Sequence, residues 1–417
     1  MKLKFIYALA IAGALSTFTS CSDDDPAPGS SLEQKTYSSD DLTLNFNGAP
    51  LIGKTVTFTP GNDGKGTVTL AGEPLDPSQI LDMITRAAAD YQPTRTIPTA
   101  GVLPGSPSVS IPVELKGDAN NCTFEGTNET EYCTYSYSGS VTADNFEFNL
   151  SDVKLKNTSL AGTWTVPDLK GINPDWGYEE NQPFNVVRIN WESSKGVDIF
   201  GSGYEMPVTA IVTLAFAMTN VDYEGESISV LEALTKVLHN VTFQEDGTLT
   251  AEYVNTKTGE TMTAPAGIAQ YVITSEGNLK LFLNPAAIIA NTARVAQRST
   301  RALDIMSLIN DLMTELKPML ESGIPLSYGQ AIADDEGNLN EDPNVKSFYL
   351  GTETLLPLLK ALTPIFTDKD FVNSLVEEAS KDPSMGGMAE YLPNILKSIP
   401  DVIGATTKIE IGINLKK

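Results

Sequence analysis

The chain offers few residues for histidine- or cysteine-based chemistry. It contains 1 histidine, His239, and 3 cysteines, which is too few for most zinc sites built from these ligands. His239 lies near the end of a predicted amphipathic helix over residues 227–239, where an imidazole caps the last carbonyl groups. The sequence nominates no nucleophile for it, so we predict no catalytic residue.

Carboxylates are the only abundant reactive groups. A pair of them performs glycoside hydrolysis without histidine, but among 53 Asp and Glu residues close pairs are expected by chance. The acidic segment 334–342 fails as an EF-hand: with Gly337 at the sixth position, Ile332 occupies the first, which requires an oxygen ligand. A looser structural Ca²⁺ site and a solvated loop remain open there. We predict no metal site and no cofactor.

One loop has the composition of a sugar-binding site. Residues 167–183 are rich in proline, asparagine and aromatic side chains, whose rings stack on sugars while amides and carboxylates accept or donate hydrogen bonds. The candidate ligand-binding residues are Asn173, Asp175, Trp176 and Tyr178. Packing of Trp176 across a barrel mouth is the alternative. Trp164 and Trp191 lie on predicted strands and are expected in the core.

The N-terminus has the pattern of a secretory signal. Lys2 and Lys4 precede an apolar run over residues 5–15, and small polar residues lead to Cys21. The apolar run is too short to span a bilayer as a helix of the mature protein. We therefore predict a signal peptide over residues 1–20 and a flexible tether over residues 21–35.

The residues around Cys21 resemble a relaxed bacterial lipobox, in which this cysteine becomes the lipidated first residue. The next four residues resemble the acidic export signal of Bacteroidales surface lipoproteins: Ser22, Asp23, Asp24 and Asp25. The resemblance implies a lipid-anchored protein of the outer membrane that faces the extracellular side.

The other two cysteines, Cys122 and Cys133, flank a segment that has the composition of a hairpin turn. Facing positions of two antiparallel strands bring Cα atoms within reach of a disulfide, and an exported protein meets oxidising conditions. We expect a structural disulfide; buried free thiols are the alternative.

Charge and length restrict the remaining possibilities. The 28 Lys and Arg residues against 53 Asp and Glu give a formal net charge of −25, which argues against a nucleic-acid partner. A chain of 417 residues is long enough for two or three domains.

Alternating apolar residues predict a first β domain over residues 36–158. The alternation of Leu42, Leu44 and Phe46 is typical of a strand, and the turn at Asp63-Gly64 is typical of a tight hairpin. A single short helix is expected over residues 77–90.

A second β domain is expected over residues 159–417. Its predicted strands include 208–218 and 279–283, and Asp246-Gly247 marks a hairpin. After residue 285 the spacing of apolar residues becomes that of helices, so we predict a helical insertion over about residues 285–403. The clean alternation of residues 408–415 predicts a last strand that returns to the sheet left at Leu283.

Gly162-Thr163-Trp164 resembles the start of lipocalin-type barrels, and the stretch 243–249 resembles lipocalin-like domains of uncharacterised Bacteroides lipoproteins. Residues 36–158 resemble the calycin-like domain of the same proteins. The resemblance implies a mainly β fold with two antiparallel barrels plus the helical insertion, α+β overall.

These observations favour a non-enzymatic surface module that binds a glycan, a small apolar ligand or an envelope protein. The alternatives are a structural subunit of an envelope assembly and, less favoured, an extracellular glycan hydrolase.

Overall fold

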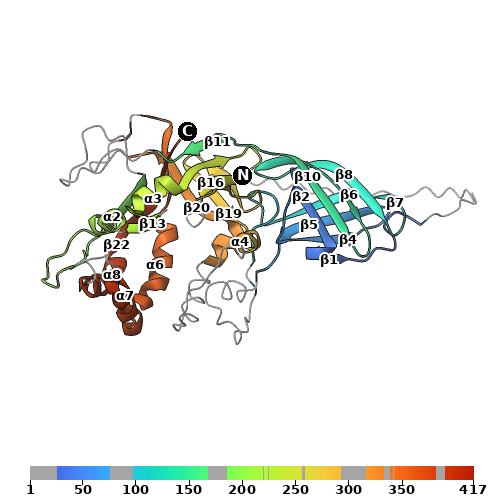
Figure 1. Cartoon of the computed structure of the whole chain (residues 1–417). Coiled ribbons are helices and arrows are strands. Elements are labelled where there is room, and N and C mark those ends of the chain that lie inside the picture. The colour runs from blue at the N-terminus through green and yellow to red at the C-terminus, as the bar shows by residue number, and fades with distance from the viewer. Residues whose placement is uncertain are drawn as a thin grey trace, which may run out of the picture.

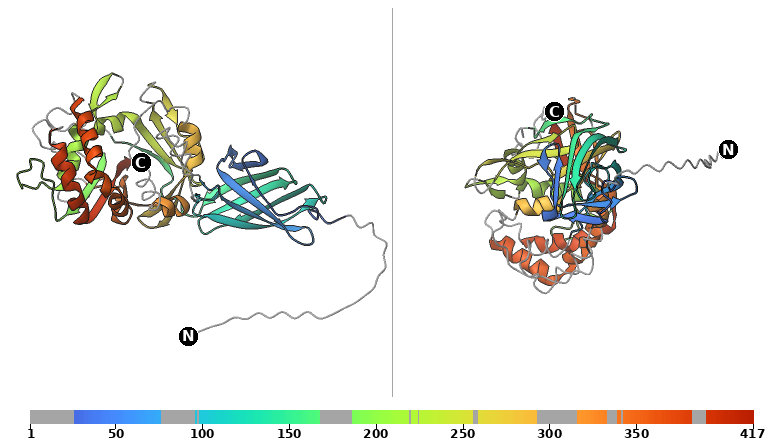
Figure 2. Two further views of the ribbon diagram at one scale, coloured as in Figure 1. Left: turned by 90° about the horizontal axis from the view of Figure 1, so that it is seen from below. Right: turned by 90° about the vertical axis from the view of Figure 1, so that its right-hand side faces the viewer.

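The computed structural model describes residues 26–75, 96, 98–167, 186–218, 220–223, 225–255, 259–292, 316–332, 339–340, 342–381 and 390–417. The chain begins with a β-sandwich, continues into a closed β-barrel and carries its helices beside the barrel. The barrel lies between the sandwich and the C-terminal helices (Figures 1 and 2).

The sandwich consists of two sheets. The first has the order β1-β4-β5-β6, made by Lys35–Ser38, Lys54–Pro60, Lys65–Gly72 and Ser108–Glu114. The second has the order β3-β2-β10-β9-β8-β7, made by Ala49–Pro50, Leu42–Phe46, Phe146–Leu155, Cys133–Val141, Cys122–Glu129 and Lys116–Gly117. A 3₁₀ turn, Ser39–Asp41, joins β1 to β2.

The predicted hairpin at Asp63-Gly64 is confirmed. Pro60 pairs with Gly66 across it, and both turn residues have positive φ, 56° at Asp63 and 72° at Gly64. This left-handed pair matches the twist of the two strands, which explains the choice of Asp and Gly.

The expected second barrel is not shown by the described strands of this unit, which form two separate sheets. Their order includes a feature that the sequence does not reveal: β2 and β10 pair in parallel, with Phe146 opposite Leu42.

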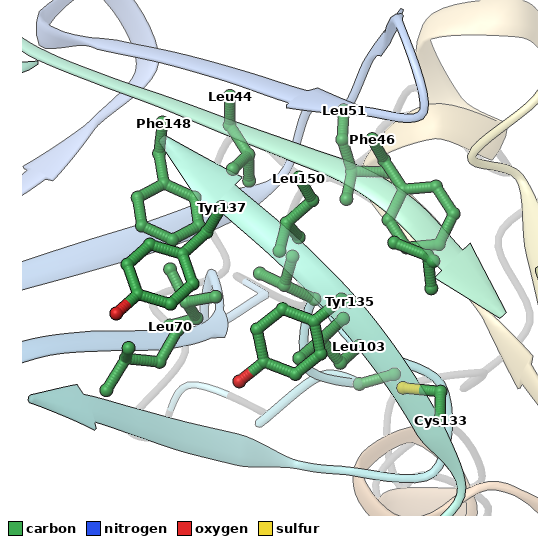
Figure 3. Packing of buried hydrophobic residues seen from close by; sticks show 14 of the residues in the cluster. Leu44, Phe46, Leu51, Leu70, Leu103, Cys133, Tyr135, Tyr137, Phe148 and Leu150 are labelled. Carbon is green, nitrogen blue, oxygen red and sulfur yellow. The ribbon is translucent and has the colours of Figure 1, made fainter. Parts of the chain in front are cut away.

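Aromatic side chains fill the space between the two sheets (Figure 3). The ring of Phe146 lies 5.2 Å from that of Tyr37 and 6.3 Å from that of Phe58, centroid to centroid, so it joins the two layers. Tyr137 and Phe148 stack at 6.1 Å within the second sheet. Alternation places these residues inward and leaves the polar residues that flank them outward.

Eight antiparallel strands form the closed barrel. In order around it they are β11 Gly162–Thr165, β15 Leu238–Phe243, β16 Thr248–Val254, β18 Ala269–Ser275, β19 Asn278–Leu283, β20 Ile324–Gln330, β21 Val345–Leu350 and β22 Thr406–Lys416. Closure occurs between β22 and β11, where Lys416 pairs with Thr165. Two more strands extend the sheet: β12 Val187–Ser193 pairs with β22, and β17 Thr261–Thr263 with β16.

The α-helices with both ends in the described part of the chain are α2 Val208–Met218, α3 Val230–Val237, α4 Pro285–Thr292, α6 Thr352–Thr367, α7 Lys369–Lys381 and α8 Leu392–Gly404. A small hairpin of β13 Asn220–Tyr223 and β14 Glu226–Ser229 separates α2 from α3. Ser229 caps α3, because its Oγ accepts a hydrogen bond from the backbone N–H of Glu232 (3.1 Å).

Three predictions about these elements need correction. Residues 208–218 are the helix α2, because eleven consecutive, largely apolar residues are too long for an average buried strand. The described part of 285–403 includes the strands β20 and β21 as well as helices. The last strand does rejoin the barrel sheet, but its neighbours are β21 and β12, whereas 279–283 lies between β18 and β20. The helix predicted over 77–90 lies outside the described residues.

The sandwich and the barrel share one apolar core. Phe46 and Leu103 of the sandwich unit belong to the same buried cluster as Val272 and Phe282 of the barrel. Hydrogen bonds cross the boundary as well: Asn47 Nδ2 donates to Asp246 Oδ2 (2.9 Å), and the Leu155 N–H donates to the Glu245 carbonyl (2.8 Å).

Candidate functional site

Four aromatic side chains meet inside the barrel. Ring centroids lie 5.3 Å apart for Trp164 and Phe348, 5.4 Å for Phe243 and Phe348, and 4.8 Å for Phe243 and Tyr271. None of these pairs comes from strands that are neighbours in the sheet, so the rings meet across the lumen. All four are buried, and we call them the aromatic layer.

The polar atoms of Trp164 and Tyr271 in the aromatic layer have hydrogen-bond partners. Trp164 Nε1 donates to the Leu160 carbonyl (2.8 Å), and the Tyr271 hydroxyl donates to the Gln244 carbonyl (2.9 Å). Burial raises the pKa of Tyr271, and the nearby Asp246 and Glu245 add to the effect, so the phenol remains a neutral donor. The aromatic layer is therefore closely packed, and it needs no ligand to satisfy its polar atoms.

Several other inward-facing side chains of the barrel are only half-buried. The pairing register puts Val241 opposite Trp164 and Ala251 opposite Val241, on the same inward face. On the other side of the barrel, Leu281 lies opposite Tyr271 and Ile324 opposite Leu281. These four apolar residues are half-buried, whereas Phe243, on the same strand as Val241, is buried.

A group of half-buried residues lies at the end from which the helices leave the barrel. Leu283 and Leu350 are inward-facing and half-buried, and each lies two residues before the start of a helix, α4 and α6 respectively. Leu238, also half-buried, directly follows α3. We call this the helical end; its half-buried inward residues are Leu238, Val241, Ala251, Tyr253, Leu281, Leu283, Ile324, Leu350 and Ile411.

A second apolar cluster fixes the helices at this end. Val402 and Ile403 of α8 and Val208 of α2 pack against Trp191 of β12 and Ile409 of β22. Trp191 Nε1 donates to Thr406 Oγ1 (2.8 Å), which ties β12 to the start of β22. The helices are thus held to the barrel wall by a core of their own.

Most of the sequence-predicted site residues lie outside the described part of the chain. These are the lipidation and export residues Cys21, Ser22, Asp23, Asp24 and Asp25, and the loop residues Asn173, Asp175, Trp176 and Tyr178. Their roles remain predictions.

The expected disulfide between Cys122 and Cys133 is wrong, because both cysteines are free and buried. Cys122 is opposite Val141, at the far end of the ladder in which Glu129 pairs with Thr134. The two cysteines are thus separated by about eight strand residues, roughly 25 Å at the usual rise, far beyond the reach of a disulfide. Burial raises the pKa of both thiols, so they stay protonated.

His239 does not cap a helix as predicted. The helix α3 ends at Val237, and His239 is the second residue of β15 with an exposed ring. Its Nδ1 lies 3.5 Å from Glu252 Oε1. The described residues around it include no hydroxyl or thiol hydrogen-bonded to the ring.

The expected core positions of Trp164 and Trp191 are confirmed by their burial. The sequence analysis missed Phe243, Tyr271 and Phe348 as lumen residues. Phe243 sits in an alternating stretch, which indicates its inward orientation, whereas Tyr271 and Phe348 are followed by further apolar residues. Their convergence depends on which strands face each other across the closed barrel, and alternation carries no such information.

Within the described residues, no three His, Cys, Asp or Glu side chains gather in a way that would hold a metal ion. Likewise, none of the helices described is both long and apolar enough to cross a bilayer. No family model, no curated protein and no solved structure matches this chain.

Proposed function

We propose that this protein is a non-enzymatic, lipid-anchored surface module of the outer membrane that binds a small apolar ligand at the helical end of its barrel. The anchoring part rests on the sequence around Cys21, and the binding part rests on the barrel. The likeness of residues 159–417 to lipocalin-like domains agrees with both parts.

One observation carries the binding proposal. Along two strands the inward-facing residues change from buried to half-buried toward the helical end: from Phe243 to Val241 on β15, and from Phe348 to Leu350 on β21. A barrel of eight strands is about wide enough for its own side chains or for one small ligand. Apolar area that the protein leaves partly exposed is stabilised when a ligand covers it.

The chemistry of the lining selects the ligand class. The half-buried residues of the helical end are apolar apart from the Tyr253 hydroxyl. A charged or strongly hydrated ligand would lose its water there without gaining partners. A neutral apolar molecule, or the apolar part of a larger one, is the ligand that fits.

The structural-subunit and hydrolase alternatives have less support. A scaffold barrel gains stability from a fully packed interior, and the helical end departs from that. A hydrolase needs two carboxylates in a shared cleft with unequal environments. The half-buried residues of the helical end include no carboxylate.

The test uses N-phenyl-1-naphthylamine, a neutral dye whose fluorescence rises in apolar surroundings. We expect saturable binding to the full chain. Ala251→Phe places a ring into the helical end and should weaken binding at least tenfold. The matched control is Thr250→Phe, the neighbouring residue of β16 that faces outward with Thr242; it should change the dissociation constant less than twofold.

Thermal unfolding of both variants shows whether the fold is kept. Dye fluorescence that rises linearly without saturation, or two variants with equal affinity, would contradict binding inside the barrel.

A further inference from the structure

The boundary between sandwich and barrel contains a buried lysine. Lys54, the first residue of β4, exposes 4% of its surface. Its Nζ donates to the Ala100 carbonyl (2.8 Å), and no carboxylate of the described residues forms an ion pair with it. An ammonium has three donors and a full charge, so this one retains two donors and an uncompensated charge.

The cost of burying this charged group lowers the pKa of Lys54. Desolvation lowers its pKa to about 8. At pH 7 the side chain is therefore still mostly a cation, held in a place from which most water is excluded. A group of opposite charge beside it would remove much of this cost.

Lys54 lines a small pocket, in which the centre of a water-sized molecule can move through about 10 Å³. Leu51 and Ala100 line it from the sandwich side, and the barrel side contributes Gly267, Ala269, Gln270, Phe282, Leu283 and Asn284. Lys54 is the one titratable group of this lining. The other walls are apolar apart from two amide side chains.

Both amides direct one N–H away from the barrel, toward the sandwich unit. Gln270 Nε2 donates to the Val102 carbonyl (3.2 Å), and Asn284 Nδ2 donates to the Ile52 carbonyl (2.9 Å). Each amide nitrogen carries a second hydrogen. The Asn284 Oδ1 is engaged with the N–H of Ala287 (3.3 Å) at the start of α4. The lining of the pocket therefore includes one ammonium group and two amide groups, each of which has a second N–H.

We propose that this pocket binds a small monovalent anion, such as chloride or formate, held by the Lys54 ammonium and the amide N–H groups of Gln270 and Asn284. The single cation fits a single negative charge. The limited volume favours an ion of one to three heavy atoms, and the apolar walls strengthen the attraction by excluding water. Phosphate or sulfate would bring a second charge that no described side chain of the lining balances.

The anion would couple the two units. Lys54 belongs to the sandwich, whereas Gln270 and Asn284 belong to the barrel. A ligand held by both stabilises their contact and, through it, the folded chain in proportion to RT ln(1 + [L]/Kd). This proposal does not rest on the apolar ligand proposed for the helical end, although Leu283 lines both sites.

The test is thermal unfolding of the full chain at pH 7 and constant ionic strength, with chloride replacing gluconate, an anion too large for the pocket. We expect the melting temperature to rise saturably by about 2 °C or more, with bromide and formate acting similarly. Lys54→Met should abolish the anion-specific rise. Lys65→Met, an exposed lysine on the neighbouring strand β5, should retain it.

A second measurement does not depend on a variant that folds. The ³⁵Cl NMR line of chloride should broaden with the wild-type protein, and formate should reverse the broadening. Equal melting temperatures in chloride and gluconate, an unchanged chloride response in Lys54→Met, or the absence of reversible broadening would each overturn the proposal.

Discussion

Two buried tyrosines of the sandwich differ in whether the hydroxyl has a partner. The Tyr37 hydroxyl donates to the Thr142 carbonyl (2.7 Å), whereas the Tyr135 hydroxyl finds no partner among the described residues. Burial, reinforced by the neighbouring Cys133 and Tyr137, raises the pKa of Tyr135 to about 12. Its phenol is therefore a neutral group that lost its hydration without replacing it.

We predict opposite effects of the same substitution at these two tyrosines. Tyr135→Phe should leave the free energy of unfolding unchanged or raise it by about 1 kcal/mol, because it removes an unsatisfied polar atom. Tyr37→Phe should lower it by about 1 kcal/mol, because it leaves the Thr142 carbonyl short of a donor. Urea unfolding of both variants measures the difference; equal losses would mean that Tyr135 has a bound partner, such as water.

Sequence reasoning at the residue scale succeeded where burial alone decides the role. The core positions of Trp164 and Trp191 follow from large apolar rings on strands. It failed for Cys122 and Cys133, because a disulfide depends on register, and the hairpin between them pairs Glu129 with Thr134 rather than bringing the two sulfurs together. The sequence does not indicate the burial of Lys54, since most of the residues that line its pocket are more than 200 positions away.

At the scale of elements, the β15–β16 hairpin connects the barrel to the sandwich. Its turn residue Gly247 has φ of 86°, and a Cβ there would come within 2.7 Å of the Pro104 ring and 3.1 Å of the Tyr271 carbonyl. The turn needs glycine both for its backbone conformation and for its close approach to another unit.

Gly247→Ala should therefore destabilise the protein by about 2–3 kcal/mol, the sum of left-handed strain and displaced packing. The control is Gly277→Ala in the β18–β19 hairpin. Its φ is 77°, and the nearest atom to a Cβ there, the Tyr328 carbonyl, is at an ordinary 3.4 Å, so a loss of about 1 kcal/mol is expected. The free energies of unfolding of the two variants, measured under the same conditions, show whether the contact with Pro104 matters. Similar losses would mean that the Pro104 ring moves aside without a cost in free energy.

The hairpins of both units were predictable, because turn chemistry and alternation are local signals. The strands β20 and β21 were not predicted, although Ile324, Leu326 and Tyr328 alternate. They interrupt a segment of helical period, and β20 pairs with β19, which precedes it by some 40 residues in the sequence. The helix α2 was predicted as a strand because short apolar runs fit both periods.

For the whole molecule, the sequence analysis predicts a mainly β chain with helices near its C-terminus. The order of strands around the barrel and the parallel pairing of β2 with β10 were outside its reach, since both are set by contacts between distant segments. The apolar cluster that joins sandwich and barrel has a consequence for stability: neither unit can unfold without exposing apolar area of the other.

We predict that the two units unfold together, and the distribution of tryptophan allows a direct test. All 3 tryptophans lie at or after position 164, so their fluorescence reports on the barrel and its helices, whereas far-UV circular dichroism reports on both units. The two signals should give the same urea midpoint in the wild type. Val272→Asp places a charge at a buried position facing the sandwich, and it should separate the midpoints by weakening the shared core. Thr274→Asp, on the same face of β18 but exposed, should leave them coincident. Separate midpoints in the wild type would mean that the hydrogen bonds and apolar contacts at the boundary are too weak to make one cooperative unit.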